Sequence, residues 1–145
     1  MRDSNYPLRK AYITALTGLT YNSVAVPVAY QELPNNISPA NYIILNSVSS
    51  NDVSAKHLSD TSTSIQVTIH TFSDQYNSGK AADDIASLVL QAIYPNRQTH
   101  LDLSADNMQC VTTELAGDNT QDYSPQANRK YIDRILTFRH RIFQL

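Results

Sequence analysis

Apolar residues recur with helical spacing in two stretches of the chain. Across residues 78–94 they follow the i, i+3, i+4, i+7, i+8 spacing of one helix face, at Ile85, Leu88, Val89, Ala92 and Ile93. The second stretch covers residues 7–16 and opens at Pro7, a residue favoured in the first helical turn, and Gly18 follows where that helix should stop. We therefore expect two amphipathic helices, the later one capped by Asn77 or Ser78 and ended by Pro95.

Other stretches have the period of two that is typical of strands. Residues 61–72 alternate most clearly, with apolar side chains on one face and polar ones on the other. Residues 24–30 alternate too, but Pro27 has no N–H to donate, so we expect an edge strand or a bulge there. Further strands are predicted over residues 42–46, 108–115 and 130–143.

Two long polar stretches separate these elements. Residues 47–63 consist almost entirely of Ser, Asn, Asp, Thr, Lys and His, and residues 117–128 are similarly polar. We expect both to be extended loops, either disordered or ordered by contact with a partner. Strands in succession with a single helix between them favour a mainly antiparallel sheet. The predicted fold is therefore α+β, a mainly antiparallel sheet of about five strands with two helices packed on one face and two long polar loops.

Length and charge narrow the class of protein. The chain has 145 residues, enough for one domain with its own core, and its 11 basic and 13 acidic residues give a net charge of −2. This charge favours neither general nucleic-acid binding nor a membrane surface. The first residues lack the basic-then-apolar order of a signal peptide, and Cys110 is the single cysteine, so we expect a cytosolic protein without an intramolecular disulfide. For Cys110 a buried apolar role is expected ahead of a reactive one.

Catalytic motifs are absent from the sequence. The four histidines are scattered singly, and the three glycines form no phosphate-binding loop. Asp83 and Asp84 are interpreted as partners of a helix dipole, because adjacent helical residues point about 100° apart and make poor joint metal ligands. We therefore expect a protein that is not an enzyme, with no catalytic residues, no metal and no cofactor.

The last predicted strand carries a basic cluster. Arg139 and Arg141 should share one face of it and Arg134 the other. Two interpretations are open: these arginines pair with carboxylates of the same domain or solvent, or they meet carboxylates of a neighbouring subunit or partner. Taken with the polar loops, they give a set of candidate interface residues: Val53, Lys56, His57, Leu58, Asp118, Tyr123, Arg134, Arg139 and Arg141.

The order of elements, with four segments along it, resembles that of a known protein family. The resemblance begins with the helix of residues 7–16 and spans nearly the whole chain. It continues through four segments: Ser23-Val24-Ala25-Val26-Pro27-Val28, Asn41-Tyr42-Ile43-Ile44-Leu45, Ser64-Ile65-Gln66-Val67-Thr68-Ile69-His70-Thr71-Phe72-Ser73 and Ser78-Gly79-Lys80-Ala81-Ala82-Asp83-Asp84-Ile85-Ala86. These segments are similar to those of the tail terminator and tail completion proteins of tailed bacteriophages. Phe72 stands where that family usually has Trp.

The resemblance implies a single tail-terminator-like domain over residues 1–145. Such a subunit would form a closed ring with copies of itself, a hexamer or a dodecamer, that terminates or completes the tail. Its other implied partners are the tail tube protein and the head-tail connector, with DNA only a non-specific passenger in the pore and no membrane contact. The implied location is the virion tail or neck, after assembly in the host cytoplasm. Alternatives are another neck or capsid adaptor ring, a peptide-binding module of the same fold, or an enzyme whose site forms between subunits.

Overall fold

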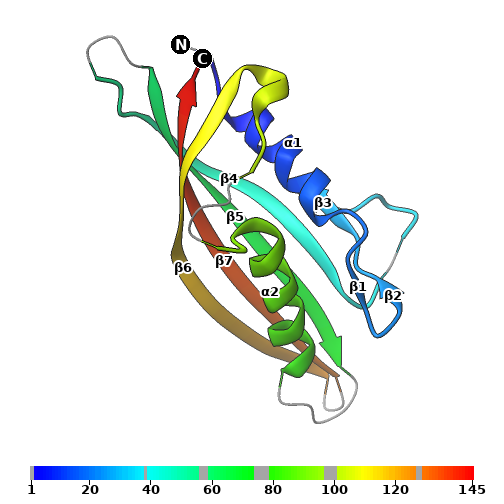
Figure 1. The fold of residues 1–145 in the computed structure, drawn as a ribbon. Coiled ribbons are helices and arrows are strands. Elements are labelled where there is room, and N and C mark those ends of the chain that lie inside the picture. The colour runs from blue at the N-terminus through cyan, green and yellow to red at the C-terminus, as the bar shows by residue number, and fades with distance from the viewer. Residues whose placement is uncertain (1, 38, 56–58, 74–78, 97–100, 127–128) are drawn as a thin grey trace.

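Two helices lie across one face of a twisted five-stranded sheet in the computed structural model (Figure 1). The structure describes residues 2–37, 39–55, 59–73, 79–96, 101–126 and 129–145. In chain order the elements are α1 (Asn5–Leu16), β1 (Thr20–Tyr21), β2 (Val24–Ala25), β3 (Val28–Tyr30), β4 (Tyr42–Asp52), β5 (Asp60–Ser73), α2 (Lys80–Ile93), the short 3-10 helix η1 (Ser104–Asp106), β6 (Met108–Gln126) and β7 (Arg129–Gln144). The α+β fold and the mainly antiparallel sheet are confirmed.

The strands of the sheet follow the order β3-β4-β5-β7-β6. All neighbours are antiparallel except β3 and β4, which are parallel. Both ends of the chain lie at the same end of the sheet (Figure 1), where the Arg2 backbone N–H donates to Gln144 Oε1 at 2.8 Å. The strand order makes β3 and β6 the two outermost strands of the described chain.

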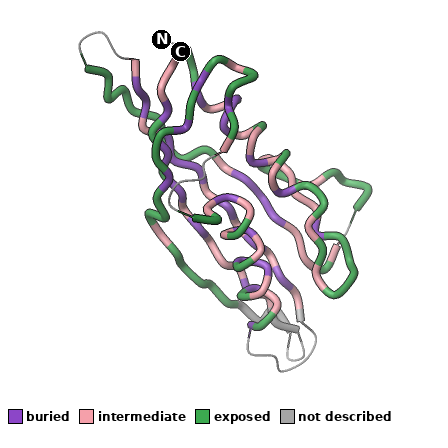
Figure 2. The backbone as a smooth tube through the Cα atoms, viewed as in Figure 1, coloured by how far each residue is buried: buried purple, intermediate pink, exposed green. Residues whose placement is uncertain are grey.

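A single apolar core lies between the sheet and the helices (Figure 2). The alternation read in the sequence places Ile65, Val67 and Ile69 of β5 on the helix-covered face, and all three are at most 1% exposed. Leu136 and Phe138 of β7 extend the same face and are fully buried. Because side chains of a strand alternate between faces, the intervening residues point to the other side of the sheet, which no described helix covers.

Pro27 divides the strand that was predicted over residues 24–30. The structure has two short strands there, β2 and β3, on either side of it. Pro27 cannot donate a ladder hydrogen bond, but its carbonyl accepts one from the Ile43 N–H at 2.8 Å. The expected edge position is confirmed, because β3 is the outermost strand on that side.

The prediction of a loop over residues 47–63 is wrong. Strand β4 continues to Asp52, β5 begins at Asp60, and Ser49–Asp52 pair with Thr61–Ser64 beyond a bulge at Val48. Polar side chains mislead here because residues 47–52 are exposed, whereas the buried residues opposite them, Thr61 and Thr63, are polar and hydrogen-bond the Ser4 hydroxyl. Residues 56–58 lie outside the described part of the chain.

The prediction of a second loop over residues 117–128 is wrong for the same reason. Strand β6 runs without interruption to Gln126 and pairs with β7 along its length, with register shifts at three places. Its residues from Asp118 to Asp122 are exposed, so the strand shows no apolar alternation there. For α2, the predicted caps Asn77 and Ser78 lie outside the described residues, and Gly79 stands at the N-cap with φ +76°.

Candidate subunit interface

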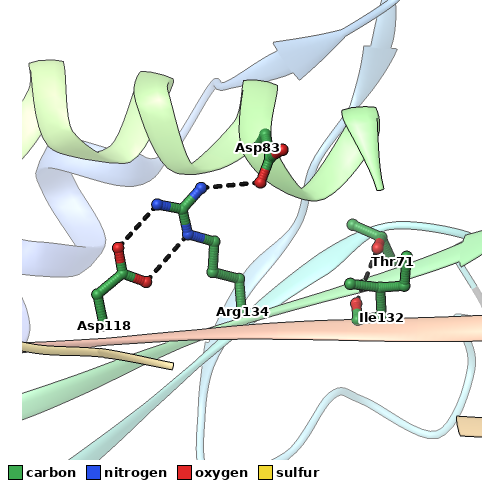
Figure 3. Close-up of polar contacts among 5 residues, drawn as sticks. All are labelled: Thr71, Asp83, Asp118, Ile132 and Arg134. Carbon is green, nitrogen blue, oxygen red and sulfur yellow. Dashed lines mark hydrogen bonds and ion pairs between the residues drawn. The ribbon is translucent and has the colours of Figure 1, made fainter. Parts of the chain in front are cut away.

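Arg134 joins the edge strand to a helix through two carboxylates (Figure 3). Its Nε and Nη2 donate to the two oxygens of Asp118 on β6, at 3.1 and 2.8 Å, and its Nη1 donates to Asp83 of α2 at 2.9 Å. The paired hydrogen bonds lower the pKa of Asp118 and raise that of Arg134. Two carboxylates share one guanidinium, so the triad keeps one net negative charge at the helix-covered side of β6.

Arg139 and Arg141 lie on the opposite, helix-free face, as their spacing predicted. Arg139 contacts Glu114 of β6 at 2.7 Å, and both side chains are about half exposed. Arg141 Nε donates to Asp60 Oδ2 at 2.9 Å, Nη2 lies 2.7 Å from the same oxygen, and the Asp60 side chain is only 7% exposed. Val53 lies beside these arginines, which together with it line one shallow hollow.

The structure therefore brings part of the predicted set together and separates the rest. Val53, Arg139 and Arg141 share the hollow on the helix-free face, whereas Asp118 and Arg134 meet on the other face. All three arginines have carboxylate partners within the chain, which is the first of the two interpretations drawn from the sequence. Predicted residues that cannot be placed are Lys56, His57 and Leu58, outside the described residues, and Tyr123, whose backbone lies in β6 but whose side chain is not described.

A second polar group on the helix-free face was not foreseen. His70 Nδ1 lies 2.8 Å from Asp133 Oδ1, and the Tyr42 ring stacks on His70 with centroids 4.6 Å apart. Tyr42, His70 and Asp133 come from three adjacent strands and pair directly across the sheet. The strand register alone brings these three residues into one row, so their spacing in the sequence could not predict this group.

A buried polar cluster lies inside the core. The Tyr12 hydroxyl hydrogen-bonds Nε2 of His140, and Thr113 Oγ1 lies 3.0 Å from Nδ1 of the same ring. Cys110 Sγ is 3.5 Å from that nitrogen, but burial raises the pKa of its thiol. A protonated, buried thiol is a poor nucleophile, so the cysteine and histidine form a structural contact here, as expected for Cys110 from its strand.

Two further features concern the described residues, the grouping of possible metal ligands and the length and apolarity of the helices. No three His, Cys, Asp or Glu side chains there are grouped closely enough to hold a metal ion. His57 and His100 lie outside the described residues. None of the described helices is both long and apolar enough to cross a bilayer.

The fold has a counterpart among solved structures. A chain of the structure titled "Virion of native gene transfer agent (GTA) particle" aligns with a TM-score of 0.58 and 22% sequence identity. The alignment covers 80% of this chain and 78% of that one. No protein-family model matches the sequence, and no curated protein matches it. The shared feature is the fold, over most of both chains.

Proposed function

We propose that this chain is a structural subunit of a phage-like virion particle. In this proposal copies of it close into a ring, a hexamer or a dodecamer, that terminates or completes the tail and joins it to the head connector. The observation that carries the proposal is the fold shared with a chain of a virion particle over 80% of the present chain. The agreement with the element order of tail terminators supports the narrower assignment to the end of the tail.

The distribution of charge suits a passage for DNA. Arg134, Arg139 and Arg141 of β7 pair within the chain with Asp118, Glu114 and buried Asp60. A surface whose cations already have carboxylate partners offers few free charges to phosphates, and DNA binding is driven mainly by such charges. The near-neutral subunit is thus suited to let DNA pass without holding it.

Exposed apolar side chains offer contacts for other virion proteins. Val48 and Val53 lie on the arm formed by β4 and β5, and Val111 and Leu115 lie on β6. Each is 38–53% exposed, so a partner that covers these side chains would gain apolar burial. The tail tube protein and the head-tail connector are the partners that the proposed role requires.

The proposal is tested by the mass of the purified protein in solution. Light scattering behind a sizing column, at several protein and salt concentrations, should give one discrete species of six or twelve copies of the 16.2 kDa chain. A monomer at every concentration, or a series of masses without a limit, would contradict a closed ring.

The passenger role of DNA is tested separately. We expect fluorescence anisotropy of a labelled double-stranded oligonucleotide to show no saturable binding at physiological salt. The control is the same titration at low salt, where weak non-specific attraction should first become visible. Tight binding at physiological salt would contradict a passage that lets DNA through.

A further inference from the structure

In the part of the chain that the structure describes, both sides of the sheet end in strand edges without a neighbouring strand. On one side, β6 is the last strand of the described chain. On the other, β3 pairs only with Ile43–Leu45 of β4, so the outer side of β4 from Asn46 to Asp52 carries no described strand. Residues 47–52 are all exposed. An uncovered edge presents backbone N–H and C=O groups that can pair with another strand.

The two edges match in direction. β4, β5, β7 and β6 are antiparallel in succession, so β6 runs opposite to β4. A second copy, rotated about an axis that lies along the strands, would set its β4 antiparallel beside β6 of the first. Its β3, which is parallel to β4, would lie antiparallel to β6 as well.

The two edges also match in their position along the strand direction. One row crosses the whole sheet from Ser49 through Ser64 and Arg139 to Glu114. A neighbouring row runs from Asn51 through Ser62 and Arg141 to Thr112. If a second copy lies beside β6 without a shift along the strands, its Ser49 would therefore lie beside Glu114 of the first copy.

The charges at the two sides are complementary. In α1, Lys10 is already paired with Asp106 at 2.9 Å, whereas the Arg9 guanidinium lies over the Tyr30 ring of β3 at 3.9 Å. The row that starts at Tyr30 ends at Asp118, in the triad that keeps one net negative charge. A neighbour joined edge to edge therefore places basic Arg9 close to acidic Asp118.

We propose that copies of this chain join edge to edge, the outer side of β6 pairing antiparallel with the outer side of β3 and β4 of the next copy. The inference rests on the proposed ring and names the surface that builds it. The contact joins two different edges, and such head-to-tail contacts close into rings when the rotation fits. Pairing of β6 with another β6 would instead bring the net-negative Asp118 triads of two copies to the same contact, where like charges repel.

Disulfide trapping tests the pairing. In the double variant Ser49→Cys/Glu114→Cys, oxidation should give a ladder on a non-reducing gel that ends at the ring number. The two single variants should form only dimers when mixed and no disulfide when alone. Because strand tilt can offset the rows, Glu114→Cys is replaced in turn by Thr112→Cys and Ala116→Cys.

Matched controls separate a specific contact from random oxidation. Wild type, whose only thiol is buried Cys110, gives the background. Thr68→Cys/Glu114→Cys places one thiol in the middle of the helix-free face and should form no ladder. Asn51→Cys/Thr112→Cys is a second edge pair, used if the first variant fails to fold by circular dichroism.

The outcomes distinguish this inference from the ring itself. A ring by light scattering with no ladder in any register would overturn the edge pairing and leave the ring standing. Dimers from Glu114→Cys alone would also overturn it, because they require β6 to meet β6. A chain that never assembles would overturn both proposals.

Discussion

Removing the guanidinium of Arg141 should destabilise the protein, whereas the same change at Arg139 should not. The substitutions Arg141→Met and Arg139→Met each delete a cation from β7 while keeping most of the apolar stem. The two arginines lie two residues apart on the same face, and each has one carboxylate partner. The difference in stability between the two variants therefore measures the effect of burying the carboxylate partner.

The expected magnitude follows from the two carboxylates. The Asp60 side chain is 7% exposed, its Oδ2 accepts a hydrogen bond from Arg141 Nε and forms an ion pair with Nη2, and its Oδ1 has no hydrogen-bond partner among the described residues. Loss of the cation leaves the buried Asp60 carboxylate without its partner, which costs about 2–3 kcal/mol, less than for a fully buried pair because the Arg141 side chain is itself half exposed. Glu114 is 57% exposed, so loss of Arg139 should change the free energy of unfolding by at most about 0.5 kcal/mol.

Equilibrium urea unfolding at pH 7 measures the free energy of unfolding of both variants. All samples have the same protein concentration, because assembly would add to the apparent stability. A third variant, Arg141→Met/Asp60→Asn, should regain part of the loss, since a neutral amide is less costly to bury than a carboxylate. Equal stability of Arg141→Met and Arg139→Met would refute the reasoning, and so would a double variant no more stable than Arg141→Met.

Three further predictions concern single groups. Tyr12→Phe removes the hydroxyl bound to His140 and should lower the free energy of unfolding by about 1 kcal/mol, with exposed Tyr6→Phe unchanged as its control. Asp118→Asn should lose less than about 1 kcal/mol at pH 7. Because the folded pKa of Asp118 lies below its usual 3.8, that difference should vanish as acid protonates the carboxylate, which unfolding curves at falling pH would reveal. Gly79→Ala should cost about 1–2 kcal/mol by thermal or urea unfolding, since Gly79 has φ +76° and a Cβ there would lie 3.2 Å from a neighbouring side chain.

The sequence predicted those elements that face the core. Residues 61–72 alternate because one side of β5 packs under the helices, and α2 shows an apolar stripe for the same reason. Pro27 marked the edge of the sheet correctly, because its missing N–H excludes a central position. Burial leaves a periodic signal, and these elements are buried.

The outer parts of the strands left no such signal. Residues 47–52 and 118–122 are exposed, and their strand structure depends on pairing with β5 and β7, which polar side chains tolerate equally well. The contacts of the candidate interface also depend on strand pairing that the sequence does not reveal. Alternation placed Arg139 and Arg141 on one face, but bulges in β6 set which acidic residue meets which arginine. Local sequence does not encode that register.

Electron microscopy of the assembled protein tests the central claim most directly. Class averages of the purified particle should show a closed ring of cyclic symmetry with an open central pore. In a reconstruction, β6 of each copy should lie beside β3 and β4 of the next. A two-fold dimer, an open filament or a ring with a filled centre would contradict the proposed role at the end of a tail.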